Sequence, residues 1–141
     1  MTVTATDLSP EQVALCRAKG VDAHVRDMYD LGFAAGCFDS AWAMNCIHHI
    51  PDADLPGVLG GLATVVGAGS PVYIGVWGGV DEEGMPEEDF YLPPRFFSFR
   101  SDATLQSLLE GSFLIESFDT FRPGEDPDDT LHMQSAFLRA R

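Results

Sequence analysis

One stretch of the sequence, residues 38–51, most constrains how this chain can fold. It begins with an Asp-flanked turn, continues as the short apolar run 41–44 and then changes abruptly to polar side chains. These polar residues are Asn45, Cys46, His48 and His49. An apolar run of this length is typical of a strand covered on both faces, and open α/β sheets bind ligands just past the carboxyl ends of such strands. We therefore look for chemistry first at residues 45–49.

The rest of the chain alternates predicted strands and helices. Runs or alternations of branched and apolar residues predict the strands, and apolar residues at helical spacing behind a capping residue predict the helices. The predicted strands cover 3–6, 21–26, 41–44, 72–77, 113–121 and 131–139, and the predicted helices cover 10–19, 55–66 and 101–110. Because an acidic turn joins the last two strands, we expect the last strand to be antiparallel to its neighbour. The prediction is one α/β domain, residues 1–141, with a mostly parallel sheet.

Composition limits the expected partners and location. The formal net charge of -14 would repel nucleic-acid phosphates and anionic lipids, so neither a nucleic acid nor a membrane is an expected partner. No apolar run approaches the roughly 20 residues of a membrane-spanning helix, and residues 1–3 lead directly into a predicted strand without a signal peptide. We expect a cytoplasmic protein whose three cysteines are free thiols.

Residues 78–94 follow the strand at 72–77 and form a long acidic stretch with aromatic residues, Phe90 and Tyr91, near its end. Uncovered loops of this length are usually functional or disordered. We interpret this segment as a lid over an active site. The aromatic run at 96–99 is more typical of a core than of a cofactor site.

Two acidic residues end consecutive predicted strands. Asp7 follows the strand at 3–6, and Asp27 follows the strand at 21–26. In dinucleotide-type folds, an acid at such a position accepts hydrogen bonds from ribose hydroxyls, and one at the next strand can accept from an adenine amino group. Each residue also suits a structural role, because Asp before Ser-Pro is a good turn residue and Asp27 can cap the turn before Asp30.

The chain resembles the class I S-adenosylmethionine-dependent methyltransferases, in particular those that act on small molecules. The resemblance covers nearly all of the chain and depends on the order and spacing of several short motifs rather than on one diagnostic motif. These motifs are ATDLSPE at 5–11, RDM at 26–28, FDSAW at 38–42, IHHIP at 47–51 and RFFSF at 95–99, with Phe113 beyond them.

The resemblance implies a Rossmann-like methyltransferase sheet, S-adenosylmethionine as cofactor and a small molecule as methyl acceptor. The implied cofactor-binding residues are Asp7 at the ribose, Leu8 on the adenine, Asp27 and Met28 flanking the adenine, and Asn45 and Cys46 at the methionine end. The implied substrate-pocket candidates are Trp77, Tyr91 and Phe96. The reaction would be an in-line methyl transfer from the sulfonium to a nucleophile, driven mainly by orientation and desolvation.

The sequence departs from the family before Asp7, where the family has a strand that ends in a glycine-rich loop. The glycines at 67–69 precede a strand, and those at 78–79 lead into the acidic segment, so neither pair replaces that loop. The expected sheet is N-terminally truncated, and two strand edges are left to pair with each other, with a second chain in an oligomer, or with a further segment. We expect weak or no cofactor binding by this chain alone. The alternative function is a non-catalytic binding or oligomerisation module.

His48 and His49 allow several interpretations. Adjacent side chains on an extended chain point in opposite directions, so a shared metal ion is not expected. One histidine, His49 for preference, could cap the following turn, and the other could act as a base toward the substrate. Cys46 has no visible basic activator and suits a buried packing role better than that of a nucleophile. A nicotinamide-dependent reductase is the weakest hypothesis, because the chain has no Tyr-x-x-x-Lys pair.

Overall fold

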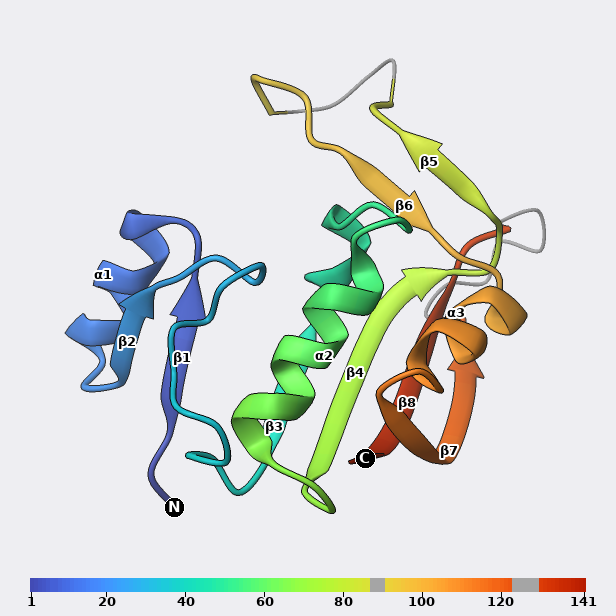
Figure 1. The fold of residues 1–141 in the computed structure, drawn as a ribbon. Helices are drawn as coiled ribbons and strands as arrows, with labels where there is room; N and C mark the ends of the chain where they lie inside the picture. Colours follow the sequence, from blue (N-terminus) through green and yellow to red (C-terminus); the bar gives the residue numbers. More distant parts are fainter. Residues whose placement is uncertain (87–90, 123–129) are drawn as a thin grey trace.

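A computed structural model describes residues 1–86, 91–122 and 130–141 (Figure 1). The elements agree closely with those predicted. They are, in chain order, β1 (Thr4–Asp7), α1 (Pro10–Ala18), β2 (Asp22–Val25), β3 (Ala41–Met44), the 3-10 turn η1 (Ile47–His49), α2 (Leu55–Val66), β4 (Pro71–Gly78), β5 (Glu82–Gly84), β6 (Phe97–Phe99), α3 (Asp102–Leu109), β7 (Phe113–Phe121) and β8 (His132–Ala140).

The main sheet has four strands in the order β3-β4-β8-β7. β3 pairs in parallel with β4, whereas β8 is antiparallel to both of its neighbours, β4 and β7. The expected antiparallel last strand is therefore confirmed, and it lies inside the sheet rather than at its edge. β1 and β2 form a separate parallel pair. The architecture is an α/β fold with a mixed sheet, as the sequence predicts.

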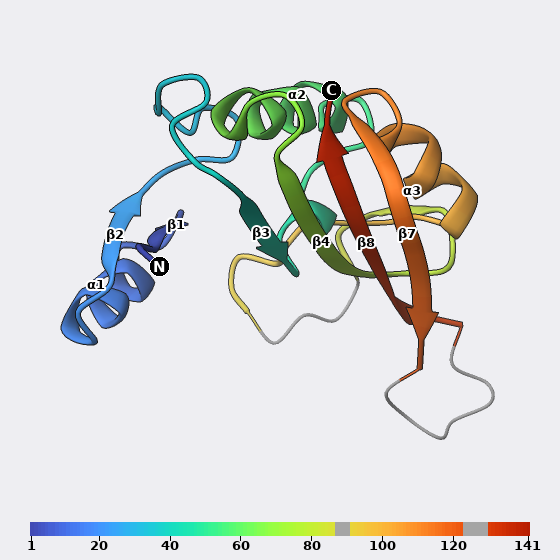
Figure 2. The same ribbon diagram turned by 90° about the horizontal axis from the view of Figure 1, so that it is seen from below.

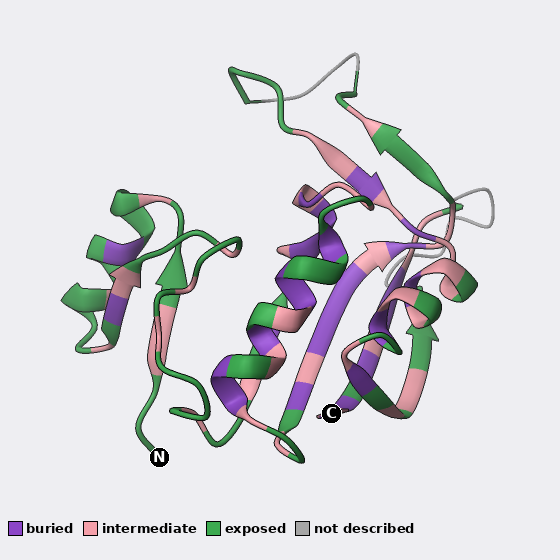
Figure 3. Ribbon diagram, viewed as in Figure 1, coloured by how far each residue is buried: buried purple, intermediate pink, exposed green. Residues whose placement is uncertain are grey.

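The hydrophobic core lies between the four-stranded sheet and the helices α2 and α3, which cover the same face (Figures 2 and 3). α2 turns Leu55, Val58, Leu59 and Leu62 toward the sheet, because residues three and four apart share one face of a helix. Val13 of α1 and Ala23 of β2 are also buried, but they lie outside this core. The β1–α1–β2 unit thus has little buried apolar surface of its own.

The helices begin as their sequences predict. Ser9 caps α1, and its Oγ accepts a hydrogen bond from the Gln12 N–H at 3.3 Å. Ser101 caps α3 in the same way, accepting from the Thr104 N–H at 3.3 Å. Satisfying one free N–H in the first turn stabilises a helix by about 1 kcal/mol.

The segment predicted as an uncovered loop at 78–94 is partly ordered, which corrects that expectation. β5 pairs antiparallel with β6, with Glu82 opposite Phe99 and Gly84 opposite Phe97. The pairing was missed because the two strands are only three residues long and widely separated in sequence. Phe90 and the acidic turn between the last two strands lie outside the described residues, and the lid hypothesis remains a prediction.

Two strand edges have no strand partner in the part of the chain that the structure describes. β1 pairs only with β2, and β3 pairs only with β4, so the two edges do not pair with each other (Figure 2). A direct pairing of β1 with β3, one of the expected possibilities, is therefore not found among the described residues. Among the described residues, no helix is long and apolar enough to cross a membrane.

Candidate functional site

The carboxyl ends of β1 and β2 carry the two predicted acids. Asp7 is the last residue of β1, and its Oδ1 accepts a hydrogen bond from the Ser9 N–H at 2.8 Å. Asp27 lies two residues past β2, and its Oδ1 accepts from the Tyr29 N–H at 3.0 Å. Both carboxylates are exposed and oriented by these turns. The structural role considered for each is therefore present, and it fixes one oxygen of each acid at the strand ends.

Asn45 follows β3 in an unusual backbone conformation. Its φ is 52°, in the left-handed region that few residues other than glycine adopt, and its N–H donates to the Gly75 carbonyl at 2.8 Å. Asn tolerates this conformation better than most residues, because its short polar side chain can bond locally. Such outliers occur frequently at ligand sites. The chain thus turns sharply where the sequence predicts chemistry, and the Asn45 side chain is left exposed.

Cys46 is the next residue after Asn45 at this end of β3. Its side chain packs partly against the core, and burial raises the pKa of its thiol. The Asp7 carboxylate raises that pKa further, so the negative charge of Asp7 acts on the position next to Asn45. Cys46 remains a thiol at neutral pH, which suits a packing residue rather than a nucleophile.

Leu8 and Met28 flank the two acids differently. Leu8 is exposed beside Asp7, whereas Met28 is half-buried against the core. The hydroxyl of Tyr29 donates to Asp54 Oδ2 at 2.8 Å, which joins the loop after β2 to the start of α2. This bond raises the pKa of Tyr29, chiefly because it is made to a carboxylate. The loop that carries Asp27 and Met28 is thereby linked to the part of the chain that carries Asn45.

His48 and His49 form a contact with each other and with the aromatic residues of β6. Their Nε2 atoms are 3.1 Å apart, and His49 Nδ1 lies 2.8 Å from the Phe96 carbonyl oxygen. Only a protonated Nδ1 can donate to that carbonyl, so His49 Nε2 accepts from His48, and His48 Nδ1 is left as a buried acceptor. Burial lowers the pKa of His48 to about 4. Neutral His48 packs on Phe97 with ring centroids 5.5 Å apart, an arrangement that favours packing over proton transfer.

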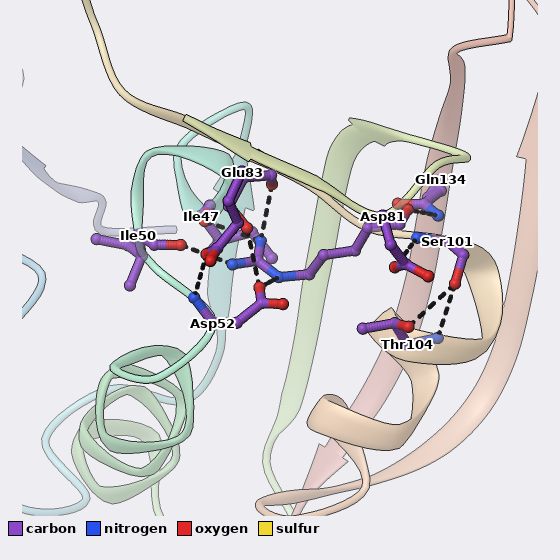
Figure 4. Close-up of polar contacts among 10 residues, drawn as sticks. Ile47, Ile50, Asp52, Asp81, Glu83, Ser101, Thr104 and Gln134 are labelled. Atoms are coloured by element: carbon purple, nitrogen blue, oxygen red, sulfur yellow. Dashed lines mark hydrogen bonds and ion pairs between the residues drawn. The ribbon is translucent and has the colours of Figure 1, made fainter. Parts of the chain in front are cut away.

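Figure 4 shows that Ile47, Ile50 and Asp52 lie together in the turn that follows Asn45. Arg100 holds this turn. Its side chain is only 2% exposed, and it donates to Asp52 Oδ1 at 2.7 Å. It also donates to the carbonyl oxygens of Ile47 at 3.2 Å and Ile50 at 2.6 Å. Burial lowers the pKa of Arg100, and the Asp52 carboxylate opposes that shift. One arginine thus fixes both ends of η1.

The β5–β6 hairpin is tied to the same turn. Ser98 Oγ donates to Asp52 Oδ1 at 2.8 Å, and the Asp52 N–H donates to Glu83 at 2.7 Å. Sequence reasoning missed this network entirely. Its one signal was the charged Arg100 at the end of an aromatic run, where an unpaired charge would be costly to bury.

The substrate-pocket candidates are separated. Trp77 lies half-buried in β4, next in sequence to Val76, which belongs to the core. Phe96 lines a hollow of about 220 Å³ with His49 and Arg95, and the Arg95 guanidinium stacks 4.2 Å from the Tyr91 ring. The structure therefore brings Phe96 next to His49, and it places Tyr91 against Arg95. No group of three potential metal ligands occurs in the described residues.

Comparisons with known proteins agree with this geometry. A family model described as a methyltransferase domain matches residues 1–69. No curated protein matches the sequence. A S-adenosylmethionine-dependent methyltransferase from Methanosarcina mazei is 13% identical with a TM-score of 0.80, and the match covers 99% of this chain and 82% of that one.

Two further structures are similar in fold. The 1,6-didemethyltoxoflavin-N1-methyltransferase of Burkholderia thailandensis, solved with bound 1,6-didemethyltoxoflavin and S-adenosylhomocysteine, is 22% identical with a TM-score of 0.73 over 98% of this chain and 60% of that one. The cyclase SpnF is 17% identical with a TM-score of 0.73 over 99% of this chain and 67% of that one. A methyltransferase-domain model thus matches the N-terminal part of the chain, residues 1–69, and the whole chain is similar in fold to S-adenosylmethionine-dependent methyltransferases.

Proposed function

We propose that this chain takes part in S-adenosylmethionine-dependent methyl transfer to a small molecule, with the cofactor at the carboxyl ends of β1, β2 and β3. The observation that carries the proposal is the left-handed turn at Asn45. The charge of Asp7 contributes to the raised pKa of Cys46, the next residue. Ligands bind at this edge in open α/β sheets.

The residues present fit an adenosyl group. Asp7 and Asp27 are exposed acceptors oriented by their own turns, as ribose hydroxyls and an adenine amino group require. Leu8 offers an exposed apolar side chain beside Asp7, and Met28 lies next to Asp27. At the methionine end, Asn45 supplies a polar side chain on a sharply turned backbone.

When bound, the cofactor supplies an electrophilic methyl group on a sulfonium. The contribution of this chain is to hold that group and the acceptor in line and to exclude water. Phe96 and Tyr91 are proposed acceptor-side residues, because Phe96 lines the hollow with His49 and Arg95, and Tyr91 stacks against Arg95. Trp77 is the third proposed substrate residue. A small acceptor agrees with the small molecule, 1,6-didemethyltoxoflavin, that is bound to the Burkholderia enzyme.

We further propose that the isolated chain binds the cofactor weakly, because no strand among the described residues pairs with the free edges of β1 and β3. The second candidate function is a non-catalytic binding module. The fold alone does not decide between them, since SpnF, which is similar in fold, is a cyclase.

Calorimetric titration of the purified chain with S-adenosylmethionine and S-adenosylhomocysteine tests the proposal. We expect heat beyond dilution that Asp7→Ala removes, while Asp119→Ala, an exposed acid on β7, leaves it unchanged. Equal heat from wild type and Asp7→Ala would refute the placement of the ribose. No heat even at millimolar ligand would favour the binding module.

A further inference from the structure

The hollow beside His49 is small and has aromatic residues in its lining. It measures about 220 Å³ and is lined by His49, Arg95 and Phe96. Pockets for drug-sized ligands usually measure about 300–1,000 Å³, so this hollow suits a molecule with a single ring. His49 and Phe96 are both half-buried, which leaves part of each residue accessible to a ligand. Aromatic side chains contact a flat ring favourably in stacked or edge-to-face arrangements.

Arg95 contributes the positive charge of this hollow, and two aromatic rings hold its guanidinium. The guanidinium carbon lies 4.2 Å from the ring centroid of Tyr91 and 5.0 Å from that of Phe97. Cation–π contacts use the face of a guanidinium, whereas its N–H donors lie at the edge in a planar fork. That fork matches the two oxygens of a carboxylate. The hollow therefore combines a place for a ring with a group that recognises a carboxylate.

The histidine pair supplies neither a donor nor a base to the hollow. His49 Nδ1 donates to the Phe96 carbonyl oxygen at 2.8 Å, and His49 Nε2 accepts from His48 at 3.1 Å. Both ring nitrogens of His49 are thus already bonded, and His48, with a pKa of about 4, is a weak base. Of the described residues that line the hollow, none can take a proton from an acceptor at neutral pH. The acceptor must therefore arrive with its nucleophilic atom already deprotonated.

The charge of the whole chain makes the contact with Arg95 decisive for an anion. The formal net charge is -14, which repels anions at a distance, but salt screens that repulsion beyond about 8 Å at physiological ionic strength. Close to the hollow, the positive charge of Arg95 is felt by its neighbours, since it contributes to the lowered pKa of His48. An anion thus gains from Arg95 only when it lies in contact range.

We propose, resting on the methyl-transfer function above, that the acceptor is a one-ring aromatic carboxylate whose carboxylate binds Arg95 and whose ring lies beside Phe96 and His49. One carboxylate oxygen accepts from the guanidinium, and the other attacks the methyl carbon. A lone pair of that oxygen forms the new C–O bond, the C–S bond breaks with its electron pair on sulfur, and no proton is transferred. The products are a methyl ester and S-adenosylhomocysteine, whose sulfur is uncharged.

Three small probes test this acceptor class by binding alone, without the cofactor. Benzoate has both a ring and a carboxylate, benzamide keeps the shape without the charge, and acetate keeps the charge without the ring. Each probe is titrated into the full chain, and the amide signals of residues 95–97 are followed by nuclear magnetic resonance. We expect benzoate to bind at least about fivefold more tightly than either other probe, because each of those lacks one of the two contacts.

Variants test the role of Arg95 in the same titration. Arg95→Gln should weaken benzoate binding about fivefold or more and remove its advantage over benzamide. Arg139→Gln is the matched control, because Arg139 is also exposed but pairs with Glu116 on the main sheet, and it should leave benzoate binding unchanged. Unchanged benzoate binding by Arg95→Gln would overturn the proposal.

The comparison of probes needs only wild-type protein, so it is independent of how the variants fold. Equal binding of benzoate and benzamide, equal binding of benzoate and acetate, or no binding of benzoate would each overturn the proposal. The calorimetric titration with S-adenosylmethionine contains no benzoate and reads the methyl-transfer function separately. Heat from the cofactor without selective benzoate binding would contradict only the acceptor class, whereas selective benzoate binding without that heat would contradict the proposed function.

Discussion

Replacing Arg100 by Met should destabilise the fold more than any other single charge removal among the described ion pairs. The change keeps an aliphatic stem but removes the guanidinium that donates to Asp52, Ile47 and Ile50. Two carbonyl oxygens then lose a donor in a buried setting, at roughly 1–3 kcal/mol each. Breaking a buried ion pair from one side costs about 3–5 kcal/mol, but Asp52 is 41% exposed, so solvent offsets part of that loss. We expect a total near 3–4 kcal/mol.

The assay is urea unfolding followed by circular dichroism, with the free energy of unfolding extrapolated to water. The matched control is Arg139→Met, since Arg139 pairs with Glu116 at a similar distance, 2.8 Å, but both side chains are more than 40% exposed. That change should cost under about 1 kcal/mol. Equal losses in the two variants, or a loss below about 1 kcal/mol for Arg100→Met, would refute a clamping role. Arg100→Lys, which keeps the charge but not the forked donors, should recover only part of the stability.

Three further outcomes follow from the structure. The pKa of His48 is lowered to about 4 in the folded protein, so neutral His48 contributes stability above pH 6.5. This contribution, up to about 3 kcal/mol, is lost as the pH falls from 6.5 toward 4. His48→Gln should flatten that part of a curve of unfolding free energy against pH. Gly78→Ala should destabilise by about 1–3 kcal/mol in thermal unfolding, since the added Cβ meets the Arg100 carbonyl, while Gly61→Ala, with open space in α2, should stabilise by about 0.5–1 kcal/mol. Amides of β1 and β2 should exchange faster than those of β4 and β8, because their unit lies outside the main core; equal protection would contradict this.

Local signals in the sequence predicted most of the fold. The α2 register follows from apolar residues at helical spacing, and the strand β3 follows from its short apolar run before Asn45. The turn bonds of Asp7 and Asp27 also follow from local chemistry, as Asx turns need only neighbouring N–H groups. In each of these cases, the residues that determine the local structure lie within a few positions of it in the sequence.

Features that depend on distant residues could not be predicted in this way. β5 and β6 are only three residues long each. The hydrogen bond that ties this hairpin to the turn after β3 joins Arg100 and Asp52, which are 48 residues apart in the sequence. The expectation that His49 caps the following turn is wrong, because its Nδ1–H donates to the Phe96 carbonyl oxygen instead. This partner lies 47 residues away in the sequence, so local patterns do not indicate it. Periodicity carries no information about such pairings.

The two halves of the proposed cofactor site differ in the contacts that hold them in place. The Asn45 side is fixed by Arg100, Asp52 and the β5–β6 hairpin. The Asp7 and Asp27 side belongs to the β1–α1–β2 unit, outside the main core, with the Tyr29–Asp54 bond as a cross-link. A ligand that contacts both halves must hold them at one separation. The free-energy cost of ordering the two halves therefore reduces the net affinity for that ligand.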